Sequence, residues 1–200
     1  MMKKILILAL LFTLAFSYCP KAISPEKATL EMEKKMNWIK KQKIGNKKNL
    51  YQPGTILVTP DKFKDVLPLG HAAIVKDSNV IIEAVKRGVV KGKNNWDDPM
   101  KGKKRFVGLK VKNLNETQLK KAVKYAEKQV GKPYNKNFFN SKTKKKFYCS
   151  QLVWAAFYDT LKINLDSEVF GLADNKKVAA IHPIELALSP HTKTVYYYAK

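Results

Sequence analysis

Hydrophobic residues recur along this chain with two different periods, one typical of strands and one typical of helices. Short runs rich in β-branched and aliphatic residues, bounded by Pro, Gly, Asp and Asn, occupy residues 55–58, 71–75, 80–85 and 106–111. Such runs predict β-strands. The turn residues Asp77-Ser78-Asn79 separate the second and third runs, so we expect these two strands to be antiparallel neighbours. Residues 194–199 are rich in Val and Tyr and predict a closing strand.

Helical periodicity appears in three segments. Ser24-Pro25 can begin a basic amphipathic helix that Gly45 ends. Asn115, with Gln118 three residues later, forms a capping pattern for a second helix. Residues 150–161 predict a third helix that is apolar around most of its surface and therefore largely buried. This mixture of strands and helices indicates the α+β class.

The first residues have the three parts of a secretory signal peptide. Lys3 and Lys4 precede an uncharged run at residues 5–16, and the small residue Ser17 follows. The run is shorter than the ~20 residues that a membrane-spanning helix needs. We therefore expect residues 1–17 to be a cleavable signal, which makes the protein secreted, periplasmic or part of the cell envelope.

The remaining chain is long enough for one domain with a substantial core, and no linker or internal repeat divides it. We assign residues 18–49 to an N-terminal tail with the amphipathic helix, and residues 50–200 to the folded domain. Cys19 raises the alternative of lipoprotein anchoring, which the bulky neighbours Phe16 and Tyr18 disfavour. The sequence does not determine the oligomeric state.

The formal net charge is +23. A field of this sign would attract an anionic cell-wall polymer or an acidic membrane surface. The alternative is a solvated, lysine-rich surface that reflects composition alone, because the lysines are spread along the whole chain. Nucleic acid is disfavoured as a partner, because no aromatic platform or recognition helix is interleaved with the charge.

The chain has only two cysteines, so a disulfide framework is excluded. Cys149 directly precedes the apolar helix, and the backbone N–H groups and dipole of a helix N-terminus favour a thiolate. The same N–H groups could stabilise an oxyanion. These properties make Cys149 a candidate nucleophile. A buried, inert cysteine is the alternative.

A cysteine nucleophile needs a general base, and the chain has three histidines. His182 and His191 adjoin prolines and are interpreted as structural or exposed. His71 begins a predicted strand directly after Gly70, whose small size would leave room for a substrate. Glu83 is the acidic residue of the apolar strand at residues 80–85, and the hairpin would return it to the level of His71. Alternatively, Glu83 faces water from a half-exposed sheet.

Five short motifs occur in a distinctive order, with the histidine strand before the cysteine helix. They are Gln52-Pro53-Gly54, Gly70-His71-Ala72, Gly131-Lys132-Pro133-Tyr134, Tyr148-Cys149-Ser150-Gln151 and His182-Pro183-Ile184-Glu185. These motifs resemble those of the NlpC-type cysteine hydrolases. Ordinary members place the cysteine first, so the order resembles the circularly permuted YiiX-like branch, which is related to lecithin retinol acyltransferase.

The resemblance implies a permuted papain-like fold, in which a small antiparallel sheet or partial barrel packs on a helix that bears the cysteine at its N-terminus. It implies that Cys149 is the nucleophile, His71 the base and Glu83 the residue that orients the base. Tyr134 and Tyr148 are then expected to be substrate-binding residues, together with Gly70.

The implied activity is that of an exported cysteine peptidase or amidase that cleaves peptidoglycan stem peptides through an acyl-enzyme. A lipid ester or amide hydrolase or acyltransferase is one alternative, and a noncatalytic binder of anionic wall polymer or membrane is another. No metal site and no cofactor are expected, because metal-ligand spacing and a Gly-rich phosphate loop are both missing from the sequence.

Two positions depart from the family pattern. Thr55 stands where an acidic residue often follows Pro-Gly, and Gln151 stands where Glu is common after Cys-Ser. Neither change removes a predicted catalytic group, so we expect differences only in local hydrogen bonding.

Overall fold

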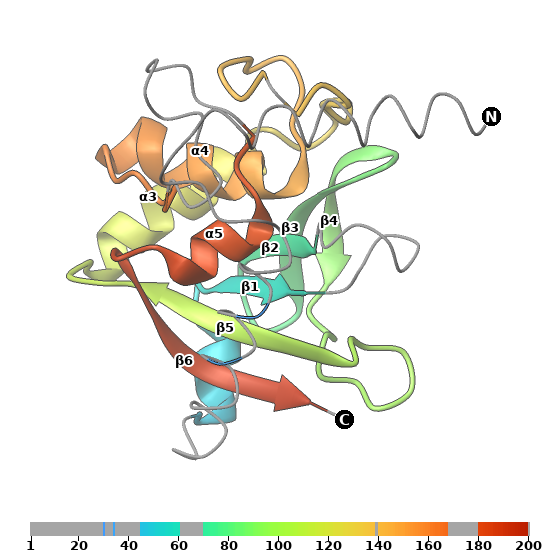
Figure 1. The fold of residues 1–200 in the computed structure, drawn as a ribbon, viewed down its shortest axis with the longest axis vertical. Coiled ribbons are helices and arrows are strands. Elements are labelled where there is room, and N and C mark those ends of the chain that lie inside the picture. The colour runs from blue at the N-terminus through green and yellow to red at the C-terminus, as the bar shows by residue number, and fades with distance from the viewer. Residues whose placement is uncertain are drawn as a thin grey trace.

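The structure is a computed structural model that describes residues 30, 34, 45–60, 70–138, 140–167 and 180–199 (Figure 1). The predicted signal peptide and nearly all of the predicted amphipathic helix lie outside the described residues. Among the helices that the structure describes, none has the length and apolar character needed to cross a bilayer.

Among the described residues, six strands form one sheet in the order β4-β3-β2-β1-β5-β6, with antiparallel neighbours throughout. The strands are β1 (Ile56–Thr59), β2 (His71–Val75), β3 (Val80–Val85), β4 (Gly88–Lys93), β5 (Arg105–Val111) and β6 (Thr192–Ala199). The sequence runs predicted all of these strands except β4. Two glycines and two lysines interrupt the hydrophobic pattern of β4, so the sequence does not indicate a strand there. All six residues of β4 pair with β3.

The hairpin between β2 and β3 forms as predicted. The Asp77 carboxylate accepts hydrogen bonds from the backbone N–H groups of Asn79 and Val80, each at 2.9 Å. An aspartate that bonds to the backbone in this way fixes a tight turn. The turn sets a register in which Ala73 lies opposite Glu83.

In the part of the chain that the structure describes, one 3-10 helix and three α-helices of defined bounds accompany the sheet. They are η1 (Lys47–Tyr51), α3 (Glu116–Glu127), α4 (Cys149–Leu161) and α5 (Pro183–Leu188). The capping box of α3 is confirmed, because Asn115 and Gln118 each accept the other's backbone N–H, at 2.9 and 3.0 Å. The short helix α5 was not predicted. It has Pro183 at its start, where the fixed φ of proline fits a helix.

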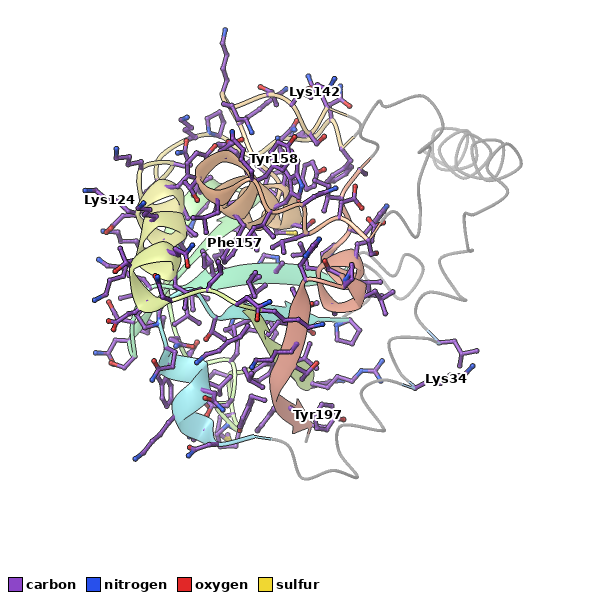
Figure 2. All side chains as sticks on the ribbon, turned by 90° about the vertical axis from the view of Figure 1, so that its left-hand side faces the viewer. Lys34, Lys124, Lys142, Phe157, Tyr158 and Tyr197 are labelled. Atoms are coloured by element: carbon purple, nitrogen blue, oxygen red, sulfur yellow. The ribbon has the colours of Figure 1, made fainter. Side chains whose placement is uncertain are left out.

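The two faces of the sheet bury different sets of residues. Ile56 and Val58 of β1 belong to the larger core, which contains the apolar residues of α3, α4 and α5. Leu57 points to the opposite face, where a smaller cluster includes Trp96 and Phe106. Figure 2 shows Phe157 of α4 on the side of the helix that faces the sheet, and its side chain is fully buried. This packing fixes α4, and therefore Cys149, against the central strands.

Candidate active site

Cys149 is the first residue of α4 and is 8% exposed. Tyr148 precedes the helix in an extended conformation, and its carbonyl accepts the N–H of Leu152 at 3.0 Å. The Cys149 sulfur interacts with the His71 side chain and with the backbone N–H groups of Ala72 and Ser150. The thiol therefore lies where the N-terminus of α4 meets the beginning of β2.

His71 and Glu83 are joined by a short hydrogen bond. The His71 Nε2 atom lies 2.6 Å from the Glu83 Oε2 atom, and the two side chains are 19% and 17% exposed. Because Glu83 occupies Nε2, Nδ1 is the ring nitrogen left for the Cys149 thiol. The structure thus brings the three predicted residues together from β2, β3 and α4.

Two further residues support this arrangement, and the sequence analysis did not single them out. The Trp96 ring stacks on the His71 ring with centroids 5.8 Å apart and planes inclined by 29°. A Cβ atom at Gly92 of β4 would lie 2.6 Å from the Glu83 Oε1 atom, so glycine leaves room for the carboxylate. A glycine inside a strand often marks a close approach of this kind, but β4 had not been recognised as a strand.

The interactions shift the pKa values of the cysteine and histidine in opposite directions. Burial by itself raises the pKa of the Cys149 thiol, but the hydrogen bond and charge of His71 and the two backbone N–H groups outweigh burial and lower it. Burial lowers the pKa of His71, whereas hydrogen bonds and charges from Cys149 and Glu83 outweigh it and raise this pKa to about 9. The arrangement therefore favours the thiolate–imidazolium pair over the neutral thiol and imidazole.

Tyr134 and Tyr148 both lie near the thiol, but they differ in exposure. Tyr134 is partly exposed, and its pKa is raised by burial and by the charge of Cys149. Tyr148 is 2% exposed, and its hydroxyl accepts the backbone N–H of Ile181 at 2.9 Å. Tyr134 is thus open to a ligand, whereas Tyr148 anchors the segment before α5.

Gly70 also lies beside the site, with φ +61. A Cβ atom there would lie 2.5 Å from the Thr59 carbonyl oxygen and 3.3 Å from Pro183. The close backbone and the left-handed conformation explain the glycine. The structure therefore accounts for Gly70 by backbone packing, and its role in leaving room for a substrate stays a prediction.

The two departures from the family pattern are buried and hydrogen-bonded. The Gln151 amide oxygen accepts from Asn135 and from the Tyr148 backbone, and its nitrogen donates to the carbonyls of Ser141 and Thr143. Every hydrogen-bonding position of this amide is therefore used. Thr55 donates its hydroxyl proton to the Asn49 carbonyl at 2.9 Å, a bond that an ionised carboxylate could not form.

Of the other two histidines, His182 lies close to this arrangement, because the neighbouring Ile181 bonds to Ser150 and to Tyr148. His182 has the extended backbone expected before proline, and burial lowers its pKa to about 4, so it is neutral. His191 is exposed, as expected. Within the described ranges, no group of three or more His, Cys, Asp or Glu side chains is arranged to hold a metal ion.

Comparisons with known proteins bear on the family and the fold of the chain. The sequence pattern of permuted papain-like amidase enzymes of the YaeF/YiiX type matches residues 45–196. The fold resembles the crystal structure of YiiX from Escherichia coli, which is described as a metalloprotein, with a TM-score of 0.56 and 19% identity over 76% of this chain and 99% of that one. None of the curated proteins compared with the chain matches it significantly. The chain therefore belongs to the permuted papain-like amidase family, a family of cysteine-type amidases with an α+β fold.

Proposed function

We propose that this protein hydrolyses amide bonds through an acyl-enzyme, with Cys149 as nucleophile, His71 as general base and acid, and Glu83 as the residue that orients His71. The observation that carries the proposal is the contact of a single imidazole with both a helix-terminal thiol and a carboxylate. A nucleophile, a base and an orienting group in this order are the parts of an activated-nucleophile enzyme.

The charged pair defines the sequence of steps. The Cys149 thiolate attacks the substrate carbonyl carbon, a sulfur–carbon bond forms, and the carbonyl electrons move onto oxygen. N–H groups in the first turn of α4 point towards this region and can stabilise the oxyanion. As the intermediate collapses, the carbon–nitrogen bond breaks and the leaving amine takes the proton from His71.

The resulting thioester is then hydrolysed. Neutral His71 removes a proton from water, the hydroxide attacks the thioester carbonyl, and the thiolate leaves as the acid product forms. Glu83 holds the ring through Nε2 in both half-reactions, so Nδ1 stays directed at the sulfur and the water. The Trp96 ring limits rotation of the imidazole by stacking on one face.

For the substrate, we propose a peptide amide bond in the stem peptides of peptidoglycan. Support comes from the signal-like residues 1–17, which would bring the protein into contact with the cell wall. The amidase chemistry of the family is consistent with it. On this view the protein is secreted, periplasmic or held at the cell envelope.

One structural feature favours a second candidate, a lipid amide or ester. The rings of Tyr134, Phe138 and Tyr148 make edge contacts, with Phe138 lying 5.4 Å from Tyr148 and 6.4 Å from Tyr134 between centroids. Phe138 is 37% exposed. These rings form an apolar cluster that is exposed at Phe138 and includes the residue next to Cys149, and such a cluster suits an acyl chain.

The experiment that tests the proposal uses purified protein with two substrates, isolated peptidoglycan and vesicles that contain N-acyl and ester lipids. Released fragments are identified by mass spectrometry. We expect peptide fragments from peptidoglycan and loss of all turnover in Cys149→Ser and His71→Ala. His191→Ala is the matched control, because it removes an exposed histidine outside the site.

The outcomes separate the candidate functions. Products from lipid alone would replace the first substrate with the second. Retained turnover in Cys149→Ser would refute the nucleophile assignment. A noncatalytic binder would give no product, and its Cys149 would react with iodoacetamide at the same rate in the presence and absence of His71.

A further inference from the structure

We infer that a lysine-rich loop at the edge of the candidate site, residues 132–146, is a docking surface for a membrane that contains anionic phospholipid. Six of these fifteen residues are lysines and none is acidic. In the whole chain, Lys and Arg together make up 39 of 200 residues, and Asp and Glu make up 16. The loop is therefore about twice as basic as the rest of the chain, and it lacks the acids that would neutralise it.

The described residues of the loop, 132–138 and 140–146, are held at the beginning of α4. The Asn135 side chain donates to the Asn140 carbonyl and to Gln151, and Gln151 donates to the Ser141 and Thr143 carbonyls. Gln151 is two residues after Cys149. These bonds anchor the loop to the first turn of α4, and Figure 1 shows the loop lying next to that helix.

Five of the six lysines divide into two groups, and the sixth, Lys146, is partly exposed. Lys132 donates to the Gln129 side chain and the Lys144 carbonyl, and Lys144 binds Asp159 at 2.7 Å, so these two serve the fold. Lys136, Lys142 and Lys145 are exposed and make no ion pair with any other residue that the structure describes. Figure 2 shows Lys142 at the outer edge of the molecule. Their charges are directed to solvent and are available to an anionic surface.

An aromatic side chain lies among these cations. Phe138 is 37% exposed, and the rest of its ring packs against Tyr134 and Tyr148. Lysine charges favour the headgroup layer of an anionic bilayer, while an aromatic ring favours the boundary with the acyl chains. An anionic wall polymer would satisfy the lysines but would leave the phenyl ring in water. The combination therefore favours a lipid surface.

The docked orientation has a consequence for the site. Because Phe138 contacts Tyr148, the residue before Cys149, insertion of the ring would bring the N-terminal end of α4, which bears the thiol, close to the bilayer surface. Membrane docking itself does not depend on the proposed function. Only the purpose given to docking, which is to bring the active site to a substrate, rests on it. Binding to vesicles does not require turnover, so the two can fail separately.

The test measures sedimentation of the purified protein with phosphatidylcholine vesicles, with and without added phosphatidylglycerol. We expect binding only to the anionic vesicles, with weaker binding as salt increases. Each lysine near such a surface contributes roughly five-fold, so the triple variant Lys136→Gln, Lys142→Gln, Lys145→Gln should bind about 100-fold more weakly. Phe138→Ala should lose the part of the binding that resists salt.

The matched control is the triple variant Lys121→Gln, Lys124→Gln, Lys128→Gln. It removes the same charge from exposed positions on and just after α3, and Figure 2 shows Lys124 on that helix, away from Lys142. This control should bind within about five-fold of the unchanged protein, because its lysines lie outside the loop.

Several outcomes would overturn the inference. Equal losses in the two triple variants would assign binding to net charge instead of the loop. Absence of vesicle binding, or binding only to purified anionic wall polymer, would exclude a lipid docking surface. Cys149→Ser should bind vesicles as the unchanged protein does, so loss of turnover with binding retained supports this inference whatever the substrate proves to be.

Discussion

Replacement of Glu83 by glutamine tests how the carboxylate acts on His71. The change keeps the size of the side chain and leaves an amide oxygen that can accept the Nε2 proton, but it removes the negative charge 2.6 Å from the ring. A hydrogen bond to a charged group contributes about 1.5–3 kcal/mol and a neutral one about 1 kcal/mol. The expected loss of transition-state stabilisation is about 1–2 kcal/mol, which lowers kcat/KM by about 5- to 30-fold.

The pH dependence gives an independent readout of the same change. The pKa of His71 is raised to about 9 in the site, so the thiolate–imidazolium pair persists up to that pH and is lost above it. Removing the Glu83 charge lowers this pKa towards its ordinary 6.5 and, because the cation is less stable, raises the pKa of Cys149. The pH range in which the pair exists therefore becomes narrower from both sides.

The assay is the rate of Cys149 alkylation by iodoacetamide as a function of pH, followed by mass spectrometry. In Glu83→Gln, the acid limb of the alkylation rate plotted against pH should move to higher pH. The alkylation rate of Cys149 at pH 7 should fall. If both the alkylation profile and kcat/KM stay within two-fold of the unchanged protein, the carboxylate does not tune His71 and the reasoning is wrong.

Three further substitutions follow from the packing. Gly92→Ala should lower kcat with little change in Tm, because its Cβ displaces the movable Glu83 carboxylate from His71. Gln151→Glu should lower the free energy of unfolding by about 2–5 kcal/mol in urea titrations, because a buried charge would face two backbone carbonyls that now accept N–H bonds. Phe157→Ala should cost about 3–5 kcal/mol by the same measurement, because the ring is fully buried. An unchanged midpoint in either unfolding experiment, or unchanged kcat in Gly92→Ala, would contradict these expectations.

Features that depend on neighbouring residues could be predicted from the sequence. The capping box at Asn115, the turn at Asp77 and the position of Cys149 at the start of an apolar helix each follow from a few consecutive residues. Their physical causes are local, because a cap or a turn is satisfied by backbone groups within three or four positions. The sequence did not predict strand β4, because glycine and lysine have a low intrinsic propensity for strands. The strand forms because its backbone pairs with β3 in the assembled sheet.

The protonation state of the site was decided by the tertiary structure alone. The hairpin predicted that Glu83 would approach His71, but the contact of Nε2 with the carboxylate, the stacking of Trp96 and the room left by Gly92 all require the assembled sheet. Likewise, α4 must pack on β2 before the Cys149 sulfur can meet the imidazole. A pKa depends on burial and on charges within a few ångströms, and these are set by which distant segments the fold brings together.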